Sequence, residues 1–516
     1  MKVSEKVIHN TLFSSIGYVW WVLVSLFLTP YIIAKVGIQG YGVFVVIEAA
    51  LGYVTALDIT GLNISLAKFV SEHNANKDFG KLHSLVRMGL VYYLFFYGAV
   101  GAVVWVLRGP FLRLFRIEPV FVPTAMAVLA GLLGIMVFKG VFSIYKAVLL
   151  GLQRMDVENV ILVVAVTLNI GFTVFLLERG MGIKGLVLAG LLMICFSAGL
   201  RAWWVNRLLP KARAGSRIFD KDLFKSAFFY GIQMQMIAFS ELINKGVDKV
   251  LLGALAGVSL SALYEIGAKV ANITNLFPAL FLPSVLPAAS ELQVLRDERR
   301  LQDLYVRGTK YLVVFLAPVC FFAVSHASLI ILAWMGFMAR QESVLAVQFL
   351  TVAYGAYLLT SVGRYIARGI GVLRFELAGS VFLTVSNIVL SVILILRYGY
   401  VGALWGTAIS AFCGSGWFLV AFHRYLKFSI GLFMRKSVFW PVAISLLASL
   451  IMEFFPASWS ADGSRLILLA KLFGHLVLFG CLYLIIIWLC GFVDAYEREV
   501  FTNAFKSLFK RRVSSV

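Results

Sequence analysis

The sequence predicts an all-α polytopic membrane protein with about 14 transmembrane helices, arranged as two six-helix lobes in parallel repeat plus two C-terminal helices. Three observations support this fold class. Hydrophobic residues make up 61% of the chain and charged residues only 14%, whereas a soluble domain is nearer half apolar and a quarter charged. Many apolar runs approach or exceed the ~20 residues that cross ~30 Å of hydrocarbon. The sequence also resembles itself at a long, nearly constant offset.

Polar interruptions divide the apolar sequence into fourteen predicted spans. The first is too long for the core of a signal peptide and lacks a small-residue cleavage site, so we expect it to remain in the membrane. Because the number of spans is even, both termini are expected on one side. The spans run near residues 11–34, 41–66, 84–107, 120–146, 158–178, 183–206, 226–254, 260–287, 308–334, 345–366, 376–397, 401–422, 438–455 and 466–491.

The distribution of lysine and arginine predicts that both termini are cytoplasmic, in a cytoplasmic (inner) membrane. Roughly thirty-two of the 46 basic residues fall in the loops and ends on the N-terminal side, as the positive-inside rule requires. One outer loop, which holds Arg108, Arg113 and Arg116, is an exception. The net charge of +21 lies in short loops that suit an anionic lipid surface, so it does not indicate nucleic-acid binding.

The internal repeat has an offset near 220 residues. YKAVLLGLQR at 145–154 and YIARGIGVLR at 365–374 share Tyr, Gly and Arg at identical spacing, and weaker matches follow in order. Because six spans separate the copies, they share one topology, and such parallel repeats hold substrate between lobes. The predicted domains are lobes 1–207 and 226–430, a cytoplasmic linker 208–225, two extra helices 437–492 and a basic amphipathic tail 493–516.

The predicted hairpin of spans 7 and 8 carries an unusual number of charges for a membrane segment. A turn near Gly257 places Lys249 level with Glu265, and Lys245 level with Lys269. Charges inside a membrane are costly and mark either function or structural pairing. Three acids balance three bases, so two interpretations stay open: a neutralised structural network, or a lining whose pairs exchange or contact an anion. The six residues are Glu241, Lys245, Asp248, Lys249, Glu265 and Lys269.

Other polar residues inside spans are also candidates. Lys139 in span 4 has no acid within one turn, which favours anion contact over snorkelling to the membrane surface. Arg364 ends span 10 and is expected to anchor the interface or to capture a headgroup. Glu48 in span 2 is a candidate for proton coupling. Asn169 and Asn387, at equivalent positions of the repeat, are expected to form interhelical hydrogen bonds.

Four segments, taken in order, resemble one known group of transporters. They are TPYIIAKVGIQGYGVFVVIEAA (29–50), LDITGLNISLAKFVSEHNANKD (57–78), DKVLLGALAGVSLSALYEIGAKV (248–270) and LPAASEL (286–292). With the six-plus-six-plus-two plan, they resemble the polysaccharide-transport branch of the multidrug/oligosaccharidyl-lipid/polysaccharide flippase superfamily, an O-antigen flippase-like branch related to lipid II flippases. The resemblance covers residues 8–430 and, more loosely, the rest.

The resemblance implies a transporter, not an enzyme, that flips a polyprenyl-diphosphate-linked oligosaccharide from the inner to the outer leaflet for cell-surface polysaccharide synthesis. It implies no cofactor and leaves the coupling ion open between H⁺ and Na⁺. The expected partners are the lipid-linked oligosaccharide, membrane lipids and other polysaccharide-assembly membrane proteins. Expected headgroup contacts are Lys139, Lys245, Lys249 and Arg364. The expected gate or coupling network is Glu48, Glu241, Asp248, Glu265 and Lys269.

Two related functions and one unrelated class remain as alternatives. A lipid II flippase would carry a chemically similar substrate. A multidrug antiporter of the same superfamily would usually have twelve spans and a functional acid in span 1, and residues 11–34 contain no acid. A membrane glycosyltransferase, polymerase or ligase would need acid/base or metal-binding residues in a sizeable loop, which the sequence lacks.

Overall fold

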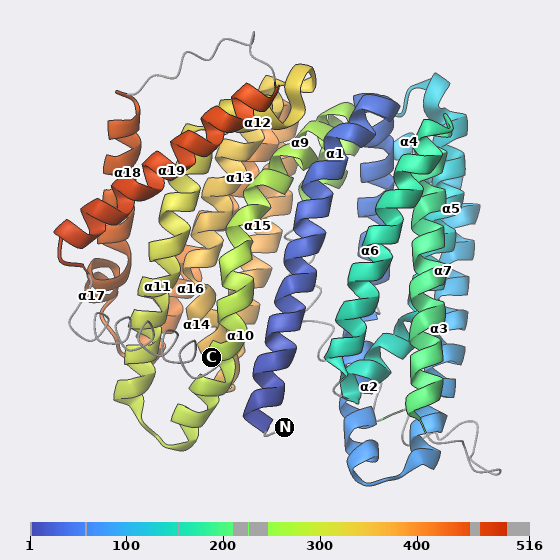
Figure 1. Ribbon diagram of the computed structural model, residues 1–516, viewed down its shortest axis with the longest axis horizontal. Coiled ribbons are helices and arrows are strands. Elements are labelled where there is room, and N and C mark those ends of the chain that lie inside the picture. The colour runs from blue at the N-terminus through green and yellow to red at the C-terminus, as the bar shows by residue number, and fades with distance from the viewer. Residues whose placement is uncertain are drawn as a thin grey trace, which may run out of the picture. The chain divides into compact units, whose positions relative to one another are not determined.

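The structure, a computed structural model, describes residues 3–56, 59–152, 154–209, 225, 246–454 and 465–492. Every regular element in this part of the chain is helical (Figure 1). The first lobe predicted from the sequence contains α1 (Val3–Ala56), α2 (Ile59–Ala75), α3 (Phe79–Val106), α4 (Arg108–Leu114), α5 (Val122–Gly151), α6 (Met155–Glu178) and α7 (Gly182–Leu208). A helical stretch over 246–255 follows.

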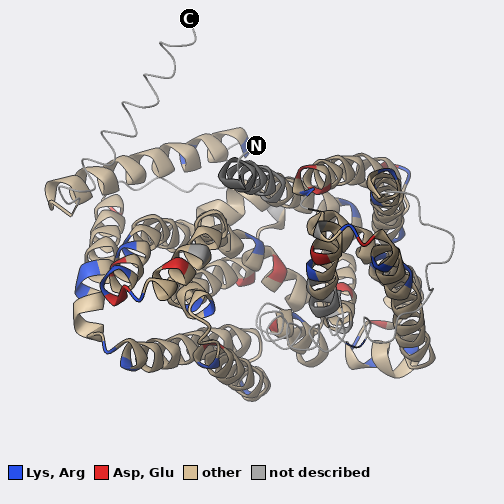
Figure 2. Cartoon of the chain, turned by 90° about the horizontal axis from the view of Figure 1, so that it is seen from below, with Lys and Arg blue, Asp and Glu red and all other residues tan. Residues whose placement is uncertain are grey.

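The remaining helices alternate long segments with short interruptions. They are α9 (Val258–Ala271), α10 (Leu276–Val294), α11 (Glu298–Ser325), α12 (Ala327–Met335), α13 (Gln341–Leu359), α14 (Ser361–Gly369), α15 (Arg374–Tyr398), α16 (Tyr400–Leu426), α17 (Ile430–Phe433), α18 (Trp440–Met452) and α19 (Arg465–Leu489). A 3₁₀ turn, Asn272–Asn275, joins α9 to α10, and a π-helical turn, Met434–Phe439, precedes α18. Viewed from below, most of the chain is uncharged (Figure 2).

Twelve helical stretches of the described chain are long and apolar enough to cross a membrane. Eleven of them overlap one predicted span each, and the first overlaps two. As one straight helix, the 54 residues of α1 would extend ~81 Å, but the chain leaves helical geometry at Gly37 (φ 75°, ψ 163°) and changes direction there (Figure 1). The predicted span 226–254 is described only from residue 246. The all-α polytopic fold is confirmed, and the total of fourteen spans stays a prediction.

The turns of the chain recur at the offset of the sequence repeat. Gly37 and Gly257 both have positive φ, at 75° and 104°, a geometry that glycine adopts without strain. Asp78 and Asp297 cap α3 and α11 in the same way, accepting the backbone N–H three residues on at 3.2 and 3.0 Å. The positive-φ pairs are Gly37 and Gly257, Lys77 and Arg296, Arg116 and Gly336, and Gly182 and Gly399. Four matching turns at offsets of 217 to 220 residues support a parallel duplication.

Contacts divide the chain into two compact units. The first comprises Met1–Leu280, Arg340–Tyr357 and Leu373–Phe418, and the second comprises Phe281–Ala339, Leu358–Val372 and Leu419–Val516. The main core of the first unit is an apolar cluster in α1, α3 and α5, including Val46, Leu82, Tyr93, Val128 and Val148. The second unit has smaller cores, one of them around Phe322, Ala448 and Phe479. The predicted lobe boundaries stay a prediction.

Within the first unit, the second half of α1 packs very closely on the hairpin formed by 246–255 and α9. A Cβ added to Gly253 would lie 2.7 Å from a methyl of Val46, and one added to Gly246 would lie 2.5 Å from Oη of Tyr53. Small residues permit such approach between helices in lipid, where packing takes the place of hydrophobic attraction. We call this contact the glycine seam; it consists of Gly42, Val46 and Tyr53 on α1 and Gly246, Gly253 and Val258 on the hairpin.

Replacing Gly253 by Leu is expected to force the seam apart. Overpacking of a tight contact costs ~1–3 kcal/mol, so the variant should unfold at a lower temperature than the parent protein in detergent. Gly52→Leu is the matched control, because Gly52 lies on the same half of α1 and a Cβ there meets nothing within 4 Å. Equal thermal stability of the two variants would contradict the role of the seam.

Candidate functional site

The predicted charge pairing across the hairpin is present. The chain turns at Gly257, and α9 begins at Val258. This turn brings the ammonium of Lys249 into an ion pair with the carboxylate of Glu265, and both side chains are largely buried, at 20% and 15% exposure. The hydroxyl of Ser261 donates to the backbone carbonyl of Lys249 at 2.9 Å and fixes the register of the two helices. The prediction that Lys249 lies level with Glu265 is confirmed.

Lys269, farther along α9, connects the hairpin to α1. Its Nζ donates to Oγ1 of Thr29 at 2.7 Å and lies 5.8 Å from the ring centroid of Tyr41. Thr29 and Tyr41 are both buried, and they lie on opposite sides of the bend at Gly37. A cation over an aromatic face is attracted by the ring electrons, more strongly when water is excluded. Lys269 therefore holds both halves of α1 against α9.

Glu48 faces this charged surface from α1. Its side chain is exposed, and it interacts electrostatically with Glu265, Lys249, Lys269 and Lys139. Charged groups of the hairpin and of α5 are therefore its electrostatic neighbours, which lowers the cost of a carboxylate inside a membrane span. We call Glu48, Lys139, Lys249, Glu265 and Lys269 the charge cluster. The predicted role of Glu48 in proton coupling stays a prediction.

Lys139 supplies the extra positive charge of the cluster. It is exposed on α5 and forms no ion pair with any other residue that the structure describes. With all five groups ionised, three lysines face two glutamates, so the cluster carries a net charge of +1. An ammonium without a fixed partner, placed within a membrane span, is available to an anion such as a phosphate. The structure thus brings together five of the nine predicted site residues.

Asp248 is not part of that cluster, and three of its described hydrogen-bond partners are hydroxyl groups, so its place in a balanced network of six charges stays a prediction. Its carboxylate is buried and accepts hydrogen bonds from Tyr264 Oη at 3.0 Å, Ser391 Oγ at 2.9 Å and Thr407 Oγ1 at 2.8 Å. Successive helix positions differ by ~100°, so Asp248 points toward α15 and α16 while Lys249 points toward Glu265. A carboxylate among hydroxyl groups offers the oxygen ligands that hard cations prefer.

Sequence reasoning identified Asp248 and missed its partners. Asn387 was expected to form an interhelical hydrogen bond, and its side chain hydrogen-bonds Asp248. Ser391 lies one turn farther along α15 on the same face. Serine and threonine are common in membrane helices, where they often bond to their own backbone, so no pattern in the sequence indicated that Ser391 and Thr407 converge on one carboxylate.

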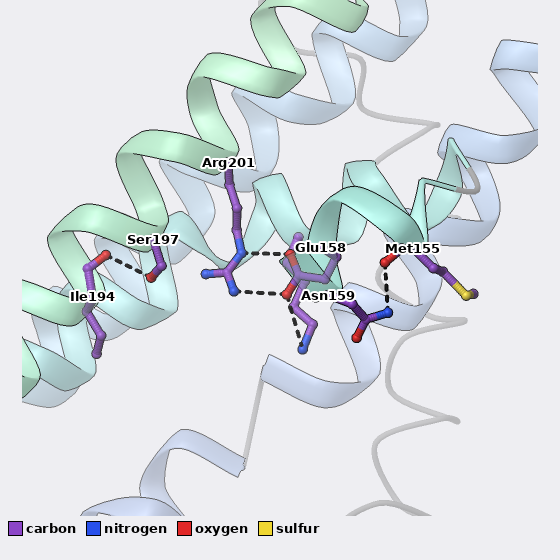
Figure 3. Close-up of polar contacts among 7 residues, drawn as sticks. Met155, Glu158, Asn159, Ile194, Ser197 and Arg201 are labelled. Atoms are coloured by element: carbon purple, nitrogen blue, oxygen red, sulfur yellow. Dashed lines mark hydrogen bonds and ion pairs between the residues drawn. The ribbon is translucent and has the colours of Figure 1, made fainter. Parts of the chain in front are cut away.

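A second ion pair that sequence reasoning missed joins α6 and α7 (Figure 3). Arg201 on α7 donates from Nε and Nη2 to the two carboxylate oxygens of Glu158 on α6, at 2.8 and 2.9 Å. Lys146 on α5 lies 3.9 Å from the same carboxylate. Glu158 lies at the start of the predicted span 158–178, and Arg201 lies near the end of the next predicted span, 183–206. Two opposite charges expected at one depth of the membrane were the sequence feature that could have indicated this pair.

The remaining predicted residues lie elsewhere. Glu241 and Lys245 lie outside the described residues. Arg364 belongs to the second unit, on α14, where it is only 3% exposed. A guanidinium this buried is closed to a lipid headgroup in the present conformation. Its predicted headgroup contact therefore stays a prediction that requires the side chain to become accessible.

The fold and the charge cluster define a multi-pass α-helical membrane protein of the transporter type. Residues 84–338 match the sequence family described as "Polysaccharide biosynthesis protein". A probable low-salt glycan biosynthesis flippase, Agl15 of Haloferax volcanii, is 23% identical over 283 residues, which are 54% of this chain and 57% of that protein. A putative O-antigen transporter of Shigella flexneri is 19% identical over 338 residues, 64% of this chain and 77% of that protein.

Solved structures share the fold. A lipid II flippase, MurJ, in an inward closed conformation has a TM-score of 0.69 at 16% identity and covers 95% of this chain and 99% of its own. An inward-facing multidrug resistance transporter of the MATE family has a TM-score of 0.62 at 17% identity, covering 81% of this chain and 95% of its own. The resemblance to the flippase superfamily is confirmed, and the chain is a relative of flippases and transporters, not of enzymes.

The pair of Lys249 and Glu265 gives a test of the cluster's energetics. Removing one partner leaves a poorly hydrated charge, at a cost of ~3–5 kcal/mol for a buried pair. Lys249→Met and Glu265→Gln should therefore each lower the thermal stability of the purified protein, and the double variant should recover part of the loss. Strictly additive losses would show that the two side chains do not interact.

Proposed function

We propose that this protein flips a polyprenyl-diphosphate-linked oligosaccharide from the inner to the outer leaflet of the cytoplasmic membrane, for the synthesis of a cell-surface polysaccharide. The charge cluster is the observation that carries the proposal. It contains three lysines and two glutamates, which would form a polar, partly cationic surface for the headgroup. The names of the relatives, a glycan biosynthesis flippase and a putative O-antigen transporter, support the same substrate class.

The chemistry of such a substrate matches the cluster. The headgroup combines a diphosphate with uncharged, hydroxyl-rich sugars, while the polyprenyl tail remains in lipid. A diphosphate needs cationic donors in a site that still admits water, because a fully neutralised site would attract it weakly and a fully dry one would strip its hydration. Exposed Lys139, which interacts with Glu48, and the paired Lys249 and Glu265 would together meet both needs.

The glycine seam is the proposed gate. It brings α1 of the first predicted lobe against the hairpin that opens the second, and Lys269 adds a hydrogen bond to Thr29 across the same contact. Alternating access by two lobes requires one contact of this kind to open when its counterpart closes. The seam consists of packing contacts and one hydrogen bond to a neutral acceptor, the hydroxyl of Thr29. Its separation therefore breaks no ion pair.

Asp248 is the proposed coupling residue. Its four polar partners come from α9, α15 and α16, so a proton or a sodium ion bound to this carboxylate would change how the three helices pack. None of these partners is a base. A cation taken up by this carboxylate would supply its counter-charge, and this uptake would link helix packing to an ion gradient.

Two alternatives use the same fold. A lipid II flippase would recognise the same diphosphate, and the match over 95% of the chain favours it as the second candidate. A multidrug antiporter is less well supported, because the MATE transporter matches only 81% of the chain and because the first predicted span has no acid.

Lys139→Ala is expected to reduce flipping at least tenfold, since a charge-assisted hydrogen bond to phosphate contributes ~1.5–3 kcal/mol. Flipping is measured as the appearance of a fluorescent lipid-diphosphate-linked oligosaccharide in the outer leaflet of proteoliposomes. Lys139→Arg should retain most activity. Arg87→Ala is the matched control, because Arg87 is an exposed base on neighbouring α3. Normal flipping by Lys139→Ala would remove this residue from the site.

Asp248→Asn is expected to uncouple transport from its driving ion. The amide keeps the shape of the side chain and can still hydrogen-bond, but it cannot take up a proton or balance a sodium ion. Accumulation of substrate driven by a proton or sodium gradient should be lost in proteoliposomes, while Ser391→Ala should weaken it only partly. Gradient-driven transport that is unchanged in Asp248→Asn would contradict the coupling role.

A further inference from the structure

One face of α5 carries two bases and a run of stacked aromatic rings. At ~100° per residue, Phe138, Lys139, Phe142, Tyr145 and Lys146 fall within ~120° of the helix surface. The rings of Phe138 and Phe142 are stacked with centroids 4.6 Å apart, and those of Phe142 and Tyr145 are stacked at 6.0 Å. The two lysines lie about two turns apart along one border of this ring stack.

The opposite face of α5 is packed against its neighbours. A Cβ on Gly140 would lie 2.2 Å from the ring of Tyr97, and one on Gly89 would lie 2.2 Å from Ile144. Tyr97 and Gly89 belong to α3, so the back of α5 is locked to that helix. Against the described residues, the aromatic and basic face is the less covered one: Phe138, Lys139 and Lys146 are exposed, and Phe142 and Tyr145 are partly buried.

The two lysines of this face interact with charged groups on other helices. Lys139 interacts electrostatically with Glu48, which also interacts with the hairpin charges. Lys146 interacts electrostatically with Lys139 and reaches toward Glu158. Charged groups at both depths of the face are the surroundings that a hydrated path provides and that lipid does not.

Lys146 is close to an acid yet remains available. Arg201 makes two short hydrogen bonds to Glu158, which satisfies both oxygens of that carboxylate. Lys146 is left with one contact of 3.9 Å, and its side chain is 52% exposed. Arg201 thereby acts as a positioning residue: it neutralises Glu158 and leaves the ammonium of Lys146 open to another anion.

We propose that this face of α5 is a subsite for a sugar diphosphate, with Lys146 and Lys139 as two successive contacts for the diphosphate and the ring stack as a platform for the first sugar. The inference rests on the proposed function and deepens it. In the predicted topology α5 ends on the inner side at Gly151, so Lys146 meets the headgroup first. Lys139 lies ~10.5 Å from Lys146 toward the start of α5. There it interacts with Glu48 on α1, the helix that forms the glycine seam.

The ring stack suits a sugar for a physical reason. One face of a pyranose presents several C–H groups, which pack against the negative face of an aromatic ring, while its hydroxyl groups stay in water. Phe142 lies between the two lysines along the helix. A sugar on Phe142 with its diphosphate on Lys146 can therefore advance to Phe138 with its diphosphate on Lys139, without leaving the face.

The test measures binding of three probes to the full chain in detergent: farnesyl diphosphate, farnesyl-diphosphate-linked N-acetylglucosamine and farnesyl monophosphate. The double variant Lys139→Ala/Lys146→Ala should weaken both diphosphate probes about tenfold to hundredfold and the monophosphate less. Phe142→Leu should weaken only the sugar-bearing probe, about threefold to tenfold. Double substitution by Arg should restore binding, which separates charge from folding defects.

Two control variants and three outcomes decide the inference. Arg87→Ala and Phe95→Leu change an exposed base and an exposed ring on α3 and should leave every affinity unchanged. If the parent protein binds the diphosphates and the α5 variants bind them equally well, the subsite is overturned and the proposed function stands. If Phe142→Leu weakens both diphosphates alike, the sugar platform is overturned. If the parent binds no lipid diphosphate, the proposed function and the subsite fail together.

Discussion

The cost of placing charge inside a membrane governs the rest of this structure. The chain meets that cost in three different ways within its first unit. Arg201 and Glu158 form a bidentate ion pair. Asp248 is surrounded by hydroxyl donors in place of a base. Glu48 and Lys139 instead stay exposed. Only the third arrangement needs water, so it marks the part of the interior that a polar substrate can share.

The gate and the charges are built on the same helices. The second half of α1 contributes Val46 and Tyr53 to the glycine seam and Glu48 to the charge cluster. The hairpin contributes Gly246 and Gly253 to the glycine seam and Lys249 to the charge cluster. Because the two features are interleaved along one pair of helices, any separation of the seam changes the distances among the charges. In the proposed mechanism, this shared pair of helices would link substrate binding to opening energetically without a separate transmission path.

The sequence predicted the spans and the hairpin register well, for clear physical reasons. Span length is set by membrane thickness, so the prediction 376–397 falls within α15 and 158–178 within α6. The pairing of Lys249 with Glu265 followed from one turn at Gly257. The partners of Asp248 could not be predicted, because Ser391 and Thr407 lie 143 and 159 residues away along the chain. The pair of Glu158 and Arg201 likewise needed knowledge of which helices pack together.

The two copies of the repeat share their turns but differ in the continuity of one helix. In the first copy, α5 runs unbroken for 30 residues. The corresponding segment of the second copy is divided into α13 and α14, with Thr360 between them. A broken helix has fewer backbone hydrogen bonds at the break and bends there more readily than a continuous one. The two copies therefore differ in stiffness. The continuous α5 of the first copy resists bending and can hold a ligand in fixed register, whereas the second copy can bend at Thr360 between α13 and α14.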